Sequence, residues 1–477
     1  MGQSTRSLAL VVLAGGGALA GVSLGFAQGD GSRTDNPDLL RGSLGVGCPA
    51  GTLCDFPAER LLARPILPAN ALASTPAPLA TVAPAEVPSV ALPAAPAPVP
   101  VLPETAPVST PVASSDHADL AYGISLRGAY VRSEDEERFE MLTIPSIGFS
   151  RSVGAADVTL DASATLVQPR SDDPRIADAQ VAFDTEYRLS PSADLAFNAD
   201  FALSQDDPQA LTVDTADLIT TPLIVSGGLG AAYTQTFGRL DATVSLGLDR
   251  EWVGSSTRSD GIEIDNDDES YTHYEGGLRL GYAVTPVLEI FGQGTAGRTD
   301  FDGADPDLGL NRNGADYTLR GGIAGNWNDV LVAELSLGSG WRDYDAARLA
   351  DAQSWLYGAA LGYRFSPTTQ IVASLETELT PGEDGGGAST RYLAGLEASH
   401  TANSWLGLRA SAGLEWLAPD DETPASRLYS AGIGADVLIG PHTSATLDYE
   451  YGLREDPGAA DARRDEHRVS GGISLQY

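Results

Sequence analysis

The chain has 477 residues and a formal net charge of −36 at pH 7, and every one of its 29 basic residues is Arg. A chain this acidic lacks the basic clusters that neutralise phosphates, which argues against nucleic acid and against an anionic membrane surface as partners. Its mean hydropathy of −0.09 is also unlike that of a protein that crosses membranes with apolar helices.

Residues 1–27 are typical of a secretory signal peptide. Arg6 supplies the positive start, residues 8–20 form an apolar run, and residues 25–27 offer a cleavage site with small side chains. The apolar run is short for a membrane helix, so an uncleaved anchor is the disfavoured alternative. We therefore expect an exported protein.

A short segment, residues 28–60, follows and holds the only two cysteines, Cys48 and Cys54. Export exposes both thiols to an oxidising compartment, which makes the pair a candidate for a small disulfide loop. No His and no second Cys pair lies nearby, so zinc ligation is not indicated there. We expect neither a metal site nor a cofactor in the chain.

Pro and Ala dominate residues 61–118. Pro removes backbone donors and fixes φ, so this stretch is predicted to be a disordered, polyproline-like linker rather than a helix or strand. About fifty such residues at about 3.1 Å each span about 150 Å. Two interpretations stay open: a tether that holds residues 28–60 away from the body of the chain, and a tail without a partner.

Apolar and polar side chains alternate in many segments between residues 119 and 477. In one of these segments Leu240, Ala242 and Val244 alternate with polar residues. Successive side chains of a strand point to opposite faces, so each such segment predicts a strand with one apolar and one polar face. Aromatic residues recur near the ends of these segments, where a transmembrane barrel has its interfacial girdles.

Short turns and long acidic connections alternate strictly between the predicted strands. Residues 153–155 and 237–239 are short turns, whereas residues 204–221 and 254–269 are long connections. A transmembrane barrel has short turns at one end and long loops at the other, and a soluble sandwich has no reason to alternate them. The pattern predicts an all-β, antiparallel, up-and-down transmembrane β-barrel of about 18 strands (16–18) over residues 119–477.

The last strand, residues 467–477, carries a recognisable pattern. Ile473, Leu475 and Tyr477 share one face, and the aromatic residue is terminal. This pattern resembles the C-terminal strand of Gram-negative outer-membrane β-barrels, which the barrel-assembly machinery recognises, so these three residues are candidates for the assembly signal. The whole body resembles the β-barrel porin families of Gram-negative bacteria, in the style of the Ala- and Arg-rich barrels of alphaproteobacteria.

The resemblance implies an integral protein of the cell outer membrane, surrounded by lipid and lipopolysaccharide, that uses the barrel-assembly machinery. The N-terminal segment and the linker would be periplasmic, with peptidoglycan or a periplasmic protein as the candidate partner of residues 28–60. Some barrels of this style are associated with exopolysaccharide export.

In such a barrel the apolar face of each strand meets lipid and the polar face lines the interior. A barrel of this strand number has room for an aqueous channel. Acids outnumber Arg on the predicted lining, which favours a weak preference for cations; the alternative is a lumen closed by charge pairs. The predicted lining residues are Arg127, Asp161, Asp184, Glu186, Arg188, Asp200, Asp241, Asp249, Glu275, Arg279, Arg320, Glu334, Arg342, Arg364, Glu376, Glu378, Glu397, Arg409, Glu415, Asp436, Asp448, Glu450, Arg454 and Arg468.

The third long connection, residues 204–221, carries apolar residues among its acids. In classical porins the third loop folds inward and narrows the pore, so the resemblance implies a constriction; an apolar cap over the mouth is the alternative. The acidic connections at 261–269 and 300–307 have oxygen ligands that suit Ca²⁺, but solvated loops are the favoured interpretation. The candidates for the constriction are Leu211, Val213, Leu218 and Ile219.

An enzyme is not expected. The chain has five His residues, but no G-x-S-x-G, H-E-x-x-H or Cys–His pattern accompanies them. The sequence therefore predicts a passive, weakly cation-preferring diffusion channel. An exopolysaccharide export barrel and a structural envelope protein with a sealed lumen are the alternatives.

Overall fold

The structure is a computed structural model. It describes residues 118–477 except 134–136, 171–173, 209, 212, 214–217, 307–308, 329, 383–387, 421–423 and 458–461. The predicted signal peptide, the cysteine-containing segment and the linker up to residue 117 lie outside the described residues.

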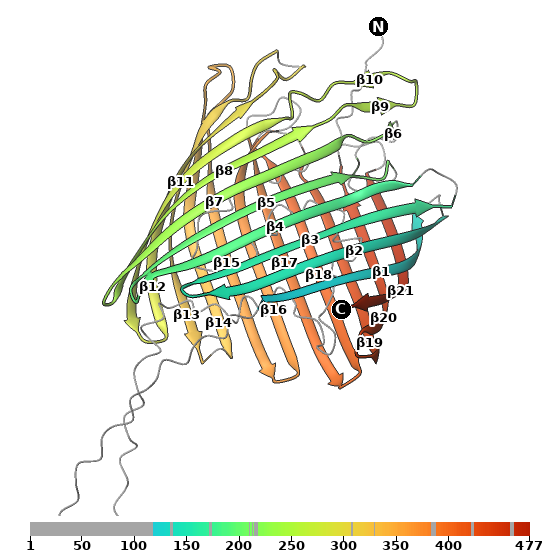
Figure 1. The fold of residues 1–477 in the computed structure, drawn as a ribbon. Helices are drawn as coiled ribbons and strands as arrows, with labels where there is room; N and C mark the ends of the chain where they lie inside the picture. The colour runs from blue at the N-terminus through green and yellow to red at the C-terminus, as the bar shows by residue number, and fades with distance from the viewer. Residues whose placement is uncertain are drawn as a thin grey trace, which may run out of the picture.

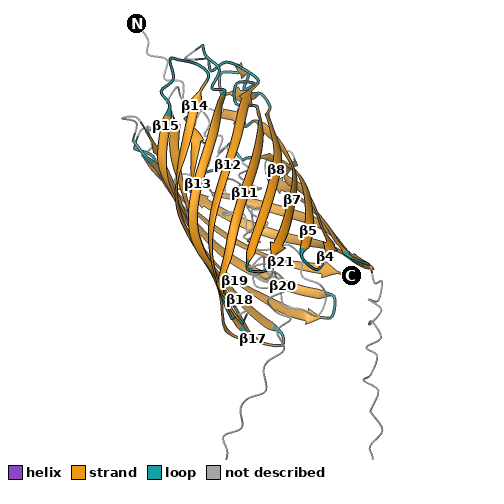
Figure 2. Cartoon of the chain, turned by 90° about the vertical axis from the view of Figure 1, so that its left-hand side faces the viewer, coloured by secondary structure: helices purple, strands orange, loops and turns teal. Residues whose placement is uncertain are grey.

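Eighteen antiparallel strands form one closed sheet (Figure 1), which confirms the predicted barrel and its strand number. Consecutive barrel strands are hydrogen-bonded neighbours, and they run obliquely around the barrel (Figure 2). The barrel strands are β1 (Ala118–Ser133), β2 (Glu137–Val153), β3 (Ala156–Pro169), β4 (Arg175–Ser190), β5 (Ala193–Gln205), β7 (Leu223–Phe237), β8 (Leu240–Val253), β11 (Tyr271–Thr285), β12 (Leu288–Phe301), β13 (Gly314–Trp327), β14 (Leu331–Tyr344), β15 (Ala352–Ser366), β16 (Thr369–Pro381), β17 (Ala388–Asn403), β18 (Leu406–Pro419), β19 (Ser426–Gly440), β20 (Thr443–Glu455) and β21 (Arg463–Gln476).

The first and last strands close the barrel. β1 pairs with β21 from Gly123 opposite Gln476 to Ser133 opposite Glu466. Beyond this ladder, the Tyr122 amide donates to the Tyr477 carbonyl at 2.9 Å and the Tyr477 amide donates back at 3.0 Å. Closure leaves no unpaired edge along the wall, which is the requirement for a sheet in an apolar phase.

The outer face of the barrel is apolar and the inner face is polar. On β8, Val244 and Leu246 are 50% and 63% exposed, whereas Thr243 and Ser245, which alternate with them, are 8% and 5% exposed. Exposed large apolar side chains recur in this way around the whole wall. Exposing so wide an apolar surface to water is unfavourable, so the outer face is suited to contact with lipid. Among the described residues, no helix has the length and apolarity to cross a membrane.

The two ends of the barrel differ. At one end, here the short-turn end, pairs of strands join through tight turns, two of which need a glycine with positive φ: Gly154 at 63° and Gly238 at 69°. The other end, here the long-loop end, carries the long connections. Two of these connections join in a small sheet of β6 (Leu218–Thr220), β9 (Ser256–Arg258) and β10 (Glu263–Ile264), visible at the top of Figure 1.

Candidate functional site

The inner face is the candidate functional site because it gathers the charged side chains. The predicted lining residues lie on the polar face of their strands, and many of them alternate with exposed apolar neighbours. Arg127, for example, is 5% exposed while the adjacent Leu126 is 51% exposed. That these side chains line a water-filled pore stays a prediction.

The predicted lining residues differ in burial along the wall. Nine are buried, and they concentrate on β1, β11, β14 and β18–β21: Arg127, Arg279, Arg342, Arg409, Asp436, Asp448, Glu450, Arg454 and Arg468. Thirteen are half-buried: Asp161, Asp184, Asp200, Asp241, Asp249, Glu275, Arg320, Glu334, Arg364, Glu376, Glu378, Glu397 and Glu415. Glu186 and Arg188, near the short-turn end of β4, are exposed.

Arg409 is at the centre of the most buried ion-pair cluster. Its guanidinium lies 2.8 Å from Asp436 and 2.7 Å from Asp448, and Asp448 also lies 3.4 Å from Arg127. Arg409 and Asp448 come from β18 and β20 and meet across Gly434 of β19, which has no side chain to separate them. Four strands are thereby joined on the inner face.

Two further clusters also have an Arg between two acids. The Arg279 guanidinium lies 3.2 Å from both Glu289 and Glu334, and it stacks over the Phe291 ring at 3.5 Å. The Arg391 guanidinium lies 3.0 Å from Glu378 and 2.9 Å from Glu415. Pairing of this kind offsets the cost of removing charges from water.

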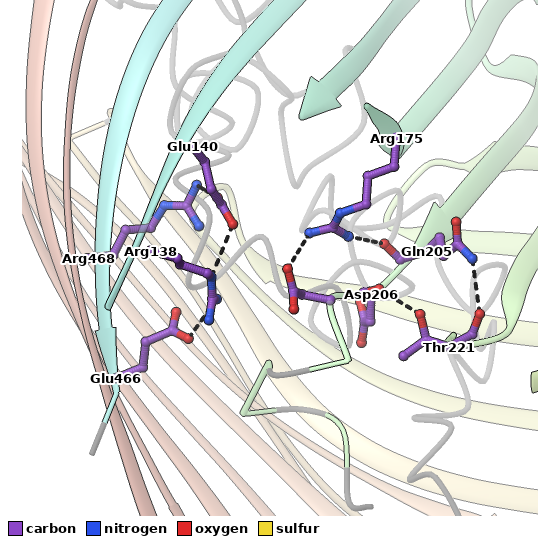
Figure 3. A network of polar contacts seen from close by, with 9 residues as sticks. Arg138, Glu140, Arg175, Gln205, Asp206, Thr221, Glu466 and Arg468 are labelled. Atoms are coloured by element: carbon purple, nitrogen blue, oxygen red, sulfur yellow. Dashed lines mark hydrogen bonds and ion pairs between the residues drawn. The ribbon is translucent and has the colours of Figure 1, made fainter. Parts of the chain in front are cut away.

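A fourth cluster joins β2 to β21 near the long-loop end (Figure 3). Glu140 lies 3.1 Å from Arg138 and 3.3 Å from Arg468, and Arg138 also lies 3.1 Å from Glu466. These contacts cross β1, which lies between the two strands in the wall. The buried acids therefore stabilise the part of the wall where β1 and β21 close the barrel.

Several inward-facing charges were missing from the predicted lining. Six further charged residues form ion pairs on the inner face: Arg138, Glu140, Glu289, Asp316, Arg391 and Glu466. The signal that could have found them is parity: Glu140 lies between Phe139 and Met141, which are both exposed on the outer face.

The third long connection is fixed at its base by hydrogen bonds (Figure 3). Arg175 donates to the Gln205 carbonyl at 3.1 Å and pairs with Asp207 at 2.7 Å, while the Thr221 hydroxyl donates to the Asp206 carbonyl at 2.6 Å. The Gln205 side chain donates to the Thr221 carbonyl at 3.0 Å. The two ends of the connection are therefore held together where it leaves the wall.

The middle of this connection reaches another part of the wall. The Leu211 carbonyl accepts hydrogen bonds from Arg454 of β20 at 3.3 Å and from Arg464 of β21 at 3.4 Å. Leu211 and Val213 are buried, whereas Leu218 is half-buried and Ile219 is 60% exposed in the small sheet of β6. The four constriction candidates thus divide into two that lie inside and two in the small sheet.

Ion pairs also tie the long-loop end of the strands to the adjoining connections. Arg250 pairs with Asp302, and Arg298 lies 2.7 Å from Asp345. The hydrogen bonds from these guanidinium groups hold the pKa of the Asp302 and Asp345 carboxyls below their ordinary value. In the fourth long connection, burial raises the pKa of Asp268.

A closed barrel with an apolar outer wall, a charged inner wall and long loops at one end defines a porin-like outer-membrane β-barrel. The family model described as "Putative beta-barrel porin 2" matches residues 151–477, and the chain belongs to this family. Among curated proteins, none matches the sequence.

The chain is similar to several solved outer-membrane proteins. The outer membrane protein opdK of Pseudomonas aeruginosa is 12% identical, with a TM-score of 0.37 over 75% of this chain and 99% of that chain. OccK3 (OpdO) of the same organism is 12% identical, with a TM-score of 0.37 over 75% and 96%. The siderophore receptor PirA, also from Pseudomonas aeruginosa, is 10% identical, with a TM-score of 0.38 over 76% and 81%.

Proposed function

We propose that this porin-like barrel is a passive, weakly cation-preferring diffusion channel of the outer membrane. The observation that carries the proposal is a set of buried carboxylate oxygens on the inner wall. Oε1 of Glu251, Oε1 of Glu275 and Oδ1 of Asp316 have no hydrogen-bond partner among the described residues. Buried carboxylates without a hydrogen-bond partner in the protein are costly unless water or a cation reaches them or a proton neutralises them, and the first two cases support a hydrated interior.

The distribution of charge supports a preference for cations. Arg279, Arg391 and Arg409 each lie between two acids, so their positive charge is already matched within the wall. On the neighbouring strands, Asp200 of β5 and Asp249 of β8 face one another across Gly228. A wall that brings acids face to face in this way raises the local concentration of cations.

We infer that the third long connection narrows this channel near the long-loop end, which is the extracellular end in a barrel of this class. The buried position of Leu211 and Val213 and the hydrogen bonds from Arg454 and Arg464 support that role. Leu218 and Ile219 would instead cover the mouth as part of the small sheet.

The lipid and protein partners of the barrel are those expected for a porin-like outer-membrane β-barrel. Lipid and lipopolysaccharide would contact the exposed outer face, and Ile473, Leu475 and Tyr477 point outward as an assembly signal would. β1 begins at the short-turn end, where Ala118 pairs with Arg151, which supports a periplasmic position for the preceding residues. A partner of residues 28–60, peptidoglycan or a periplasmic protein, belongs to this proposal.

A structural role with a sealed lumen is the second candidate, and the ion-pair clusters favour it. Salt bridges link β1 with β18–β20, and others link β2 with β21, on the inner face. Liposome swelling with neutral sugars of increasing size separates the two candidates. A channel admits the small sugars and excludes the large ones, whereas folded barrels that admit none would support the sealed lumen and overturn the channel.

A further inference from the structure

Three metal-ligating side chains meet on the inner wall near the long-loop end. His273 and Glu275 lie on β11, and Asp316 lies on β13. One ligand atom from each of these three residues lies within 4.8 Å of the others. The Thr299 hydroxyl lies 3.0 Å from Nδ1 of His273 and fixes the orientation of the ring.

The strand register explains why these side chains converge. His273 and Glu275 are two residues apart and therefore share a face of β11. Glu275 pairs with Gly297 of β12, and Gly297 pairs with Asp316. Gly297 thus separates the two carboxylates in the sheet without placing a side chain between them. A Cβ at Gly297 would lie 2.8 Å from Cε1 of His273 and closer still to Oδ2 of Asp316.

The two carboxylates of this site each have an oxygen without a hydrogen bond from a cation among the described residues. Oε1 of Glu275 and Oδ1 of Asp316 are buried without a hydrogen-bond partner. Nη1 of Arg342 and Nδ1 of His273 each lie 3.8 Å from Oδ1 of Asp316, which is within ion-pair distance but beyond hydrogen-bond distance. Two acids held together in this way require a cation between them or the protonation of one acid.

The Arg409 cluster also has a glycine between two charged side chains, but there an Arg of the protein is the cation. The glycine is Gly434, and Arg409 binds Asp448 at 2.7 Å. At Gly297 both flanking residues are acids, and an imidazole completes the set. The Gly297 site therefore has no Arg opposite the glycine on either neighbouring strand.

We propose that His273, Glu275 and Asp316 bind one divalent transition-metal ion, of the zinc class, on the inner wall near the extracellular mouth. An imidazole nitrogen with two carboxylate oxygens suits Zn²⁺, whereas Ca²⁺ and Mg²⁺ prefer oxygen ligands alone. Three protein ligands leave a coordination position open to water. The site exists whether or not the barrel conducts ions, because it needs only the folded wall.

Zinc titration of the purified full-length barrel, freed of metal by a chelator and followed by calorimetry, tests the site. The wild-type barrel is expected to bind one Zn²⁺ per chain at this site. His273→Ala, Glu275→Gln and Asp316→Asn are each expected to weaken that binding by at least about tenfold. Asp260→Asn removes a charge from an exposed loop and is the matched control, with binding unchanged.

Two glycine variants test the geometry without removing a ligand. Gly297→Ala places a methyl group against His273 and Asp316, whereas Gly292→Ala on the same strand places it in open space. Zinc binding should be lost in the first and kept in the second, with both variants folded as judged by circular dichroism and heat-modifiable electrophoretic mobility. A folded wild-type barrel that binds no zinc, or ligand variants that bind it as tightly as the wild type, would overturn the proposal.

Discussion

Nη1 of Arg454 donates a 3.3 Å hydrogen bond to the carbonyl oxygen of Leu211, although 243 positions separate the two residues. Arg454 lies on the inner face of β20 and Leu211 lies in the connection that follows β5. In the wall, β4, β3, β2, β1 and β21 lie between these two strands. The contact therefore ties Leu211, in the third long connection, to the inner face of a distant part of the wall.

Arg454→Ala should release this connection. A hydrogen bond from a charged donor contributes about 1.5–3 kcal/mol, so its loss allows the connection to leave the interior for part of the time. We expect a larger and noisier single-channel conductance than in the wild type. Arg463→Ala, which removes an exposed Arg from β21, is the control and should conduct as the wild type does. Identical traces from all three proteins would contradict an anchoring role for Arg454.

Asp448→Asn should destabilise the barrel strongly. The substitution leaves Arg127 and Arg409 buried with fewer acidic partners, and breaking a buried pair costs about 3–5 kcal/mol. Urea unfolding in detergent measures the loss. The matched control is Asp194→Asn, because Asp194 pairs with the exposed Arg188 at 3.4 Å and a surface pair contributes about 0–1 kcal/mol. Equal losses in the two variants would show that the Arg409 cluster is as hydrated as the surface pair.

The pair of Arg250 and Asp302 should contribute to stability in a pH-dependent way. Its hydrogen bonds lower the pKa of Asp302 in the folded state, so the contribution is present above the unfolded pKa of about 3.9 and is lost as the pH falls through the lower folded value. Asp302→Asn should therefore reduce the unfolding temperature slightly at pH 7 and leave it unchanged in strong acid. A difference from the wild type that grows as the pH falls would contradict this sign.

Tyr477→Ala should impair closure of the barrel. The Tyr477 ring stacks on Tyr122 at 5.8 Å and on His442 at 4.9 Å between centroids, and such pairs contribute about 0.5–1.5 kcal/mol each beyond area burial. We expect slower refolding into detergent and a smaller heat-modifiable fraction. Phe237→Ala, which removes an exposed aromatic residue at the same end, is the control. Refolding that is slowed equally by both variants would assign the effect to lost apolar surface rather than to closure.

The barrel itself could be predicted because its signals are local. Apolar and polar residues alternate within each strand because one face meets lipid and the other lines the interior. Short and long connections alternate because the two ends of the barrel differ, so about 18 strands could be counted from the sequence. The same parity places residues such as Arg127 and Asp448 on the inner face. It applies equally to Glu140, whose neighbours Phe139 and Met141 are exposed and apolar, and to Arg391, whose neighbour Tyr392 is aromatic.

Contacts between distant segments could not be predicted, because they depend on register and closure. The approach of Glu275 to Asp316 requires both to align with Gly297, and a shift of one residue would turn either side chain to the lipid. The small sheet of β6, β9 and β10 has strands of two or three residues, which are too short to show a period. The contact of Leu211 with Arg454 follows only once the barrel is closed.

The reversal potential of single channels in a planar bilayer under a salt gradient tests the central claim most directly. A hydrated lumen in which acids outnumber Arg predicts a steady conductance and a reversal potential directed toward cations. Asp249→Asn should reduce that preference, because it removes one of the two acids that face each other across Gly228. No conductance from folded protein, or a reversal potential directed toward anions, would contradict the proposed channel.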